Sequence, residues 1–424
     1  MLQLVNVGHK KLADYATIAT HGLMDEIVDL AKPLAGARVL ELSATAFGGG
    51  VAEIQYTLVP LMQDAGLDVE WRIIRGAEEF FAATKTIHNA LQGNPQGLTE
   101  DQRKCFSRFQ ELNAREIEIE DYDFVVVHDP QPVGVIDYLG GGRAKWAWRG
   151  HIDFSTPNDE VLDFLLPSIR RYDVAIFHLA SYVPTRANLP PCVIWPPAID
   201  PLAPKNMALS QEDASYIVDQ FGIDIGRPLL TQVSRFDPWK DPLGVIDAYR
   251  LVKEEVAGVQ LALVGSMAHD DPEGWEYWNQ TVAYADGDPD IFILSNLNNV
   301  GSVEVNAFQV HSSAVIQKSI KEGFGLTVSE ALWKTRPTVA GNVGGIVTQI
   351  ESGRTGWLVG SSEECADACL EILADSRAAR ERALAGKEHV RRHFLTPRLL
   401  RDRFALFNRL RGRDTDVDLE VIAA

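Results

Sequence analysis

The stretch SIKEGFGLTVSEALW, residues 319–333, decides the fold that we expect for this chain. The apolar run AVIQKS, residues 314–319, predicts a buried strand, and a glycine-containing loop separates it from a helix that should begin near Leu326 or Thr327. A strand, a glycine turn and a helix in this order are typical of a parallel α/β sheet. The N–H groups at the start of such a helix are free to bind an anion such as phosphate.

The same alternation of short apolar runs and amphipathic segments occurs in two series, which predicts two lobes of the Rossmann type. The first series holds ARVLEL (37–42), VEWRII (69–74), FVVVHD (124–129), AKWAWRGHIDF (144–154), VAIFHLA (174–180) and CVIWPP (192–197). The second holds LLTQVS (229–234), VQLALVGS (259–266), IFILS (291–295), AVIQKS (314–319) and PTVAG (337–341). The arginine-rich tail after residue 375 predicts two or three further helices.

The proline-rich segment PPAIDPLAPKN, residues 196–206, separates the two series. Prolines at this density stop helices and central strands, so we place the hinge there. We expect an N-terminal lobe over residues 1–200, a second lobe over residues 201–395 and a C-terminal helical segment over residues 396–424.

The overall composition favours a small-molecule partner. A chain of 424 residues with 46% hydrophobic and 23% charged residues is typical of a globular protein of two or three domains. A net charge of -19 opposes binding to nucleic acid or to an anionic membrane. The N-terminus has no apolar segment of the kind that targets a protein for secretion, so we expect a cytoplasmic protein.

Two carboxylates flank the glycine loop, Glu322 before it and Glu330 one turn into the helix. Carboxylates beside an anion site suit a ligand that carries both phosphate and sugar hydroxyls, because hydroxyls donate as well as accept. The alternative is an ordinary turn with two surface glutamates. Further groups that suit a close-lying phosphate are Gly323, Gly325, Thr327 and Ser329.

Two cations follow the first strand of the second lobe. Arg235 and Lys240, in TQVSRFDPWKDPLG, should lie at the same carboxyl edge of the sheet as the glycine loop. Two cations there can neutralise a departing diphosphate without a metal ion. The alternative is a pair of solvated surface cations.

The first lobe carries a similar glycine turn in ELSATAFGGGVAEI, with glycines at residues 48–50. The spacing is not Gly-x-Gly-x-x-Gly, so the motif does not favour binding of a nicotinamide or flavin dinucleotide. His151, in WRGHIDFS, should end a strand at this edge, where a structural role is as plausible as a sugar contact. Asp129 and Gln131, in VHDPQPVG, suit a sugar or a turn equally.

With these motifs the chain resembles the retaining glycosyltransferases of the GT-B architecture, the large family of sucrose and glycogen-type synthases. Within that family it is most similar to the trehalose glycosyl-transferring synthases, through ELSATAFGGGVAEI, VHDPQP, WRGHIDFS, VSRFDPWKDP and SIKEGFGLTVSEALWK. The resemblance spans nearly all of the chain. It implies an α/β fold of two Rossmann-like lobes whose parallel sheets face each other across a deep cleft. It also implies that the C-terminal helix crosses back to the N-terminal lobe.

The resemblance implies roles for the residues of the second lobe, which would hold the sugar nucleotide. Arg235 and Lys240 would bind the donor diphosphate, and Glu330 would bind the ribose hydroxyls. Glu322 would hold the glucosyl hydroxyls. It would act together with the backbone amides of Gly323, Phe324, Gly325 and Leu326.

In the first lobe, which would bind the acceptor, His151 would touch the donor sugar, and Gly49 and Gly50 would approach the phosphate and the acceptor. Candidates for acceptor contacts are Asp129, Gln131 and Asp153. The resemblance thus assigns catalysis to His151 together with Glu322, Arg235 and Lys240. No metal is required in such enzymes, and Mg²⁺ would at most stimulate.

The expected activity is that of a hexosyltransferase. It would move glucose from ADP-, UDP- or GDP-glucose to glucose, reversibly and with retention of the anomeric configuration, to form trehalose. The alternatives are a retaining trehalose phosphorylase, another disaccharide or glucoside synthase, an epimerase and a catalytically silent sugar-nucleotide sensor. Apart from a sugar nucleotide and a sugar acceptor we expect no other partners, although a homodimer is compatible with the sequence.

Overall fold

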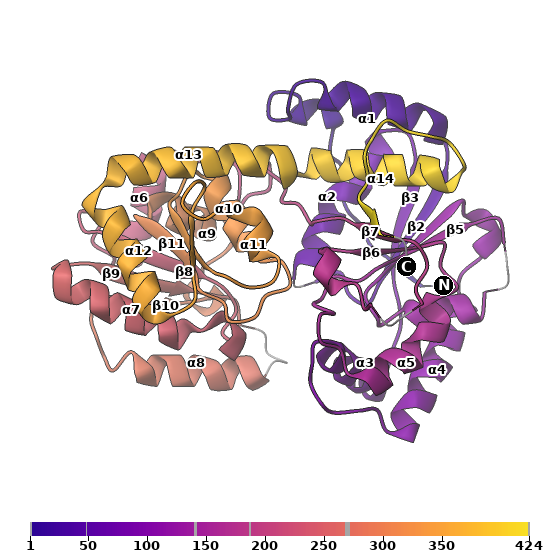
Figure 1. Ribbon diagram of the computed structural model, residues 1–424, viewed down its shortest axis with the longest axis horizontal. Coiled ribbons are helices and arrows are strands. Elements are labelled where there is room, and N and C mark those ends of the chain that lie inside the picture. Colours follow the sequence, from indigo (N-terminus) through magenta and orange to yellow (C-terminus); the bar gives the residue numbers. More distant parts are fainter. Residues whose placement is uncertain (1, 48, 140–141, 186–187, 268–271, 423–424) are drawn as a thin grey trace. The chain divides into compact units, whose positions relative to one another are not determined.

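The computed structural model describes residues 2–47, 49–139, 142–185, 188–267 and 272–422, so that Gly48 of the glycine run lies outside the described residues. The chain divides into two compact units. The first comprises Met1–Ala198 and Thr396–Ala424, and the second comprises Ile199–Leu395. Each unit is an α/β domain built on its own sheet (Figure 1).

The described part of the first unit contains an eight-stranded sheet. Its order is β1 (Gln3–Leu4), β3 (Asp68–Ile73), β2 (Arg38–Ser43), β4 (Phe124–His128), β5 (Lys145–Arg149), β6 (Val174–Phe177), β7 (Cys192–Ile194) and β14 (Val421–Ile422). Strands β2 to β7 pair in parallel, whereas β1 and β14 add antiparallel edges. The six predicted strands are confirmed, and the short edge strands β1 and β14 were not predicted.

Helices cover both faces of this sheet. One face carries α1 (Leu23–Ala31), α2 (Gly50–Asp64) and α14 (Thr396–Leu410), and the other carries α3 (Glu78–Leu91), α4 (Glu100–Ala114) and α5 (Asp159–Ile169) (Figure 1). Successive strand residues point to opposite faces, so Leu40 and Leu42 join one hydrophobic cluster while Val39 joins the other. This two-sided burial explains why the strands read as continuous apolar runs.

The second unit has a parallel sheet in the described residues. Its order is β10 (Ile291–Leu294), β9 (Gln260–Val264), β8 (Leu229–Val233), β11 (Ala314–Gln317), β12 (Thr338–Gly341) and β13 (Trp357–Val359). The five predicted strands are confirmed, and β13 was not predicted. The chain reverses its direction across the sheet between β8 and β11. In open α/β sheets such a switch point, at the carboxyl ends of the strands, is where ligands bind.

The helices of the second unit bury both faces of its sheet. One hydrophobic cluster involves α7 (Pro242–Glu255), α8 (Pro272–Tyr284) and α12 (Ser362–Ala374), and another involves α6 (Gln211–Asp219) and α9 (Ser302–His311). Helix α10 (Leu326–Trp333) packs against α13 (Ser376–His393) and the short α11 (Ile346–Gln349). Helices α13 and α14 confirm the helical tail that the sequence predicts.

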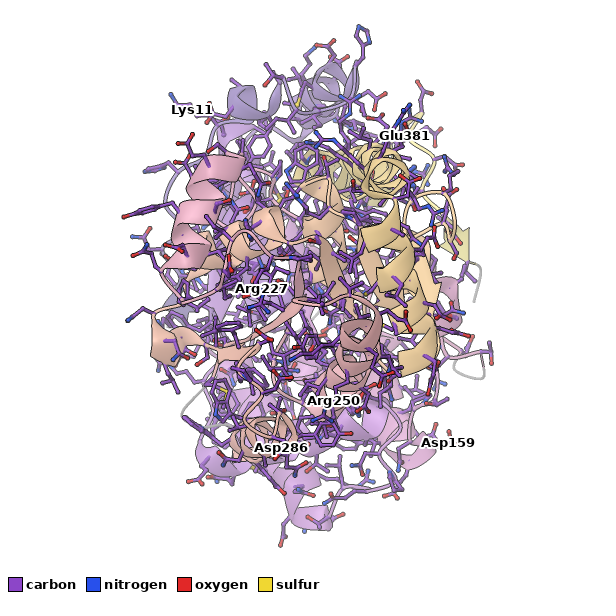
Figure 2. The ribbon with its side chains drawn as sticks, turned by 90° about the vertical axis from the view of Figure 1, so that its left-hand side faces the viewer. Lys11, Asp159, Arg227, Arg250, Asp286 and Glu381 are labelled. Atoms are coloured by element: carbon purple, nitrogen blue, oxygen red, sulfur yellow. The ribbon has the colours of Figure 1, made fainter. Side chains whose placement is uncertain are left out.

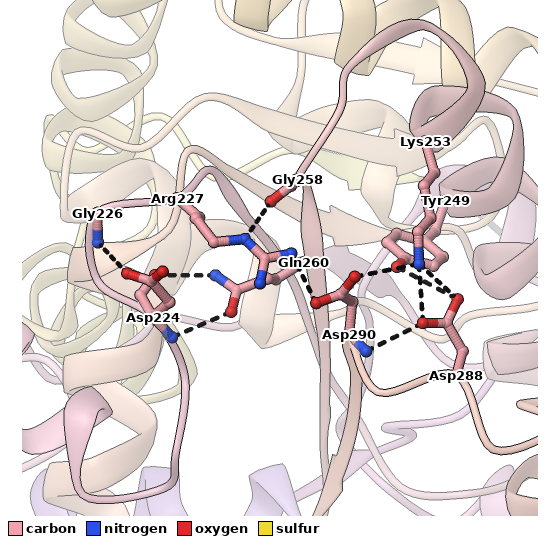
Figure 3. A network of polar contacts seen from close by, with 9 residues as sticks. All are labelled: Asp224, Gly226, Arg227, Tyr249, Lys253, Gly258, Gln260, Asp288 and Asp290. Carbon is pink, nitrogen blue, oxygen red and sulfur yellow. Dashed lines mark hydrogen bonds and ion pairs between the residues drawn. The ribbon is translucent and has the colours of Figure 1, made fainter.

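The amino edge of the second sheet is tied together by polar contacts (Figure 3). Arg227 Nη2 lies 2.6 Å from Asp290 Oδ1, and Lys253 Nζ lies 3.1 Å from Asp290 Oδ2 and 2.8 Å from Asp288 Oδ1. Gln260, at the start of β9, donates to the carbonyl of Asp224 at 2.9 Å. These contacts stabilise the amino edge of the sheet. The predicted ligand site lies at the opposite, carboxyl edge.

Exposed charged side chains lie on both units, for example Asp159, Asp286 and Glu381 (Figure 2). Within the described ranges, no helix is both long enough and apolar enough to cross a bilayer. The same residues contain no group of three or more His, Cys, Asp or Glu side chains arranged to hold a metal ion.

Candidate active site

The glycine loop of the second unit has the geometry that the sequence predicts. Strand β11 ends at Gln317 and α10 begins at Leu326, with Gly325 at φ 82° just before the helix. A Cβ at Gly325 would lie 3.1 Å from Glu322 Cγ and 3.2 Å from Ile346 Cγ1. The backbone conformation therefore favours glycine, and a side chain there would also displace its neighbours. Val328 N donates to the Gly325 carbonyl at 3.0 Å. The start of a helix such as α10 favours an anion, because the helix dipole is positive there.

Lys240 reaches this loop from the end of the neighbouring strand β8. A short 3-10 helix, Pro238–Lys240, is capped by Asp237, whose side chain accepts from Lys240 N at 3.1 Å. Gln232, buried in β8, donates to the Lys240 carbonyl at 2.7 Å. The result is a contact of 2.6 Å between Lys240 Nζ and Glu322 Oε2. The cation and the carboxylate that the sequence singled out therefore meet.

Arg235 lies differently. Its side chain is 68% exposed, and its guanidinium lies 3.4 Å from Asp237. The cation that accompanies Lys240 in a buried position is instead Lys318, which forms an ion pair with Asp241. Contact of Arg235 with a diphosphate thus stays a prediction that needs a rearrangement of an exposed side chain.

Glu330 is buried in α10, with 2% of its side chain exposed. Lys205 Nζ lies 2.6 Å from Glu330 Oε1, and Lys334, directly after the end of α10, bonds to Asn206 at 3.0 Å. Burial alone would raise the pKa of Glu330, but Lys205 and then Lys334 hold it below its usual value. Burial lowers the pKa of Lys334 to about 7. Lys205, in the proline-rich segment, was not predicted as a site residue.

Two hydroxyls near the loop are used inside the protein. Thr327 donates to the carbonyl of Val233 at 3.2 Å, and Ser329, fully buried, donates to Gln349 at 2.6 Å. Both hydroxyls thus have partners inside the protein, and donation to a phosphate stays a prediction. They fix α10 against β8 and α11.

In the first unit, the loop between β2 and α2 contains Gly49 at φ 81°, directly before the helix begins at Gly50. A Cβ at Gly49 would have no heavy atom within 4 Å, so the backbone conformation alone requires glycine there. The start of α2 lies beside the switch point between β2 and β4, as the start of α10 does in the second unit.

His151 lies in the loop after β5. The strand ends at Arg149, so the prediction that His151 ends a strand is wrong by two residues. The His151 amide donates to Asp129 Oδ1 at 2.8 Å, and Asp129, at φ 65°, donates its own amide to the Arg149 carbonyl at 2.8 Å. Burial raises the pKa of the Asp129 carboxyl to about 7. The hydrogen bond from the His151 amide and the positive charge of Arg149 act in the opposite direction but are weaker. Asp129 thus supports the His151 loop, with one oxygen occupied.

The other two acceptor candidates lie in the loops that follow β4 and β5. Gln131 has a buried side-chain oxygen with no hydrogen-bond partner among the residues described. Asp153 accepts from the amide of Ser155 at 2.8 Å, which uses one of its oxygens in a turn. Gln131 is therefore the candidate with an unused buried acceptor.

Sequence reasoning missed a buried polar cluster around the His151 loop. Arg149 is fully buried above the Trp195 ring at 5.1 Å, and none of its guanidinium nitrogens has a hydrogen-bond partner among the described residues. Burial, followed by repulsion from Arg403, lowers the pKa of Arg149 to about 9. Glu41 and His128 complete the cluster. The signal was a charged or titratable residue inside each of three apolar strands.

Comparison with known proteins identifies the family. Residues 41–184 match the family described as trehalose synthase, N-terminal domain, and residues 215–389 match glycosyl transferases group 1. A trehalose synthase of Rubrobacter xylanophilus is 59% identical over 416 residues, which cover 97% of this chain and 100% of that protein. The chain belongs to the trehalose synthase family. It is therefore a glycosyltransferase of the hexosyl-transferring class.

Other members of the trehalose synthase family match over similar lengths. A trehalose synthase of Pyrococcus horikoshii is 43% identical over 406 residues, which cover 96% of this chain and 98% of that protein. The sucrose-phosphate synthase structure from Thermosynechococcus elongatus aligns with a TM-score of 0.71 at 16% identity, over 89% of this chain and 99% of that one. The predicted GT-B fold and the resemblance to trehalose glycosyl-transferring synthases are confirmed.

Proposed function

We propose that the protein transfers a glucosyl unit from a nucleoside-diphosphate glucose to glucose, reversibly and with retention of configuration, to form trehalose. The observation that carries the proposal is the contact of Lys240 with Glu322 beside the start of α10. This contact lies beside the start of a helix, and a cation, a carboxylate and a helix N-terminus at one switch point suit a diphosphate that is joined to a sugar. The product is taken from the names of the two trehalose synthases, and glucose as the acceptor follows from the resemblance.

In the donor half of the reaction, Lys240 and the amides of residues 323–326 neutralise the charge that grows on the departing diphosphate. Glu322 accepts hydrogen bonds from glucosyl hydroxyls, and Arg235 turns toward the diphosphate when it binds. Glu330, held ionised by Lys205, accepts from the ribose hydroxyls.

At the reacting carbon, the bond to the phosphate oxygen breaks and a bond to the acceptor hydroxyl oxygen forms on the same face. The acceptor proton passes to the departing phosphate, and nucleoside diphosphate leaves. His151 contacts the glucosyl unit, while Gly49 and Gly50 let the phosphate and acceptor approach α2. Asp129, Gln131 and Asp153 contact the acceptor. The reaction uses no resident metal, Mg²⁺ at most stimulates it, and we place the enzyme in the cytoplasm.

The test is incubation of the purified chain with glucose and each of ADP-, UDP- and GDP-glucose, with the linkage determined by NMR. The proposal predicts an α,α-1,1-linked disaccharide and one nucleoside diphosphate for each disaccharide formed. Cleavage of trehalose by inorganic phosphate, without any nucleotide-dependent synthesis, would show a phosphorylase instead. Binding without turnover would show a sensor, and a new free sugar formed without acceptor would show an epimerase.

A further inference from the structure

A chain of buried polar contacts leads through the first unit to His151. Glu41, in the middle of β2, is fully buried and receives a hydrogen bond from Arg403 of α14 at 2.8 Å. Its other carboxylate oxygen lies 2.6 Å from His128 Nε2 and also accepts from Gln55 at 2.9 Å. His128 Nδ1 in turn lies 2.8 Å from His151 Nε2. The exposed end of this chain is His151, which is half-buried.

The charge states of Glu41 and His128 follow from the groups around them. Burial would raise the pKa of the Glu41 carboxyl, but Arg403 and then the His128 hydrogen bond bring it below its usual value, so Glu41 is ionised. Burial lowers the pKa of His128, although Glu41 opposes the shift. His128 is therefore neutral at pH 7.

His151 is neutral for a related reason. Burial lowers its pKa well below the usual range. The positive charge of Arg149 and the neighbouring rings of His128 and His178 act in the same direction. Arg403 adds to this effect from α14. Two neutral imidazoles in contact must share one proton between the facing nitrogens.

The position of that proton is decided at Glu41. His128 Nε2 faces both the Glu41 carboxylate and the side-chain nitrogen of Gln55, and the Gln55 amide donates to Glu41. An ionised carboxylate accepts hydrogen bonds and donates none, so its contact with His128 favours a proton on His128 Nε2. The Nδ1 atom of His128 then has a lone pair and accepts from His151 Nε2–H. His151 Nδ1 is left with a lone pair, so this atom accepts hydrogen bonds and cannot donate one.

We propose that Glu41 and His128 are positioning residues that hold His151 as a hydrogen-bond acceptor for one hydroxyl of the transferred sugar. A hydroxyl can donate to His151 Nδ1, whereas a phosphate oxygen, itself an acceptor, cannot pair with it. These polar contacts therefore direct His151 to a hydroxyl of the sugar and not to the diphosphate. The identity of the hydroxyl-bearing ligand rests on the proposed function, but the direction of the hydrogen bonds does not.

The direct test is ¹⁵N NMR of the histidine rings in the intact, unliganded chain at pH 7, with the His128 and His151 signals assigned from H128N and H151N variants. We expect both rings to be neutral and protonated on Nε2. A His151 ring protonated on Nδ1, or on both nitrogens, would overturn the proposal. This measurement uses no substrate, so its outcome is separate from the fate of the proposed function.

A kinetic test uses Glu41→Gln, which replaces the ionised acceptor by an amide that can also donate. We expect kcat/KM for the sugar nucleotide to fall about tenfold, which corresponds to one lost hydrogen bond, while KM for the acceptor is unchanged. Asp137→Asn is the matched control, since Asp137 bonds to Ser168 and Arg171 in the same unit, outside the chain of contacts. We expect full activity from it.

Sugar-nucleotide donors that each lack one hydroxyl distinguish a positioning role of Glu41 from a general loss of activity in Glu41→Gln. For the donor that lacks the hydroxyl bound by His151, wild type and Glu41→Gln should have equal kcat/KM, whereas the other deoxy donors should keep the tenfold difference. An equal loss with every donor would overturn the positioning role. If the wild-type chain transfers no glucosyl unit at all, the proposed function fails, and the NMR result alone decides the direction of the hydrogen bonds.

Discussion

Lys240 Nζ lies 2.6 Å from Glu322 Oε2, although the two residues belong to loops that follow different strands, β8 and β11. These strands are neighbours at the point where the chain reverses its direction across the sheet. The contact therefore marks the switch point of the second unit with a paired cation and carboxylate. A diphosphate with an attached sugar would meet both groups at once.

Loss of the Lys240 charge should remove stabilisation of the leaving group. For Lys240→Met we expect kcat/KM for the sugar nucleotide to fall by about 100-fold or more, a loss typical of one missing electrostatic contact in a transition state. Initial-rate kinetics measure this change. Arg250→Ala, which alters a cation on α7 of the same unit, should leave kcat/KM unchanged. Equal activity of Lys240→Met and wild type would remove Lys240 from the mechanism.

Gly325 can be tested against a glycine with the same backbone conformation. Gly325→Ala and Gly353→Ala both place a Cβ at φ near 80°, but only the first Cβ meets other atoms, in Glu322 and Ile346. Both variants should lose about 1–2 kcal/mol of stability from backbone strain. Calorimetric titration with nucleoside diphosphate should show between about tenfold and 100-fold weaker binding for Gly325→Ala alone. Equal affinities would show that the loop tolerates displacement.

The sequence predicts those parts of the site whose residues are close together along the chain. The loop of residues 319–333 was predicted correctly because strand, glycine turn and helix are consecutive, and Gly325 alone indicates the unusual backbone conformation. Glu41 was missed because its partner Arg403 lies 362 residues later. The internal contacts of Thr327 and Ser329 were not predicted for the same reason, since their acceptors belong to other elements.

The sequence also did not predict the direction in which side chains of loop residues point. Arg235 and Lys240 look equivalent in sequence, but Gln232 and Asp237 hold the backbone of Lys240 while Arg235 extends into solvent. His151 was placed at the end of a strand because its neighbours are apolar. The pairing of β5 with β4 ends at Arg149, whose carbonyl accepts from the Asp129 amide. Beyond it the His151 amide donates to the Asp129 side chain and not to a strand carbonyl.

The Asp129 carboxyl should make stability depend on pH near neutrality. Its pKa rises on folding from an ordinary value of 3.8 to about 7, so the folded state holds a proton that the unfolded state releases. The stability that this group contributes is complete below pH 3.8 and is lost as the pH rises through about 7. Asp129→Asn keeps a neutral group, so its melting temperature relative to wild type should increase between pH 5 and pH 8. A constant difference would contradict this account.

The network at the amino edge of the second sheet should affect stability and not catalysis (Figure 3). Asp290 pairs with both Arg227 and Lys253, so Asp290→Asn should lower the free energy of unfolding by about 1 kcal/mol. Urea denaturation measures the loss. KM for the sugar nucleotide should stay at the wild-type value, because the network lies at the edge opposite Lys240. A raised KM would show that the two edges are coupled.

The most direct measurement is a crystal structure of the intact chain with nucleoside diphosphate bound. We expect the phosphate next to the cleaved bond to accept hydrogen bonds from the amides at the start of α10. We also expect Lys240 to turn from Glu322 to this phosphate. A diphosphate bound elsewhere in the second unit, with Lys240 still paired to Glu322, would contradict the account.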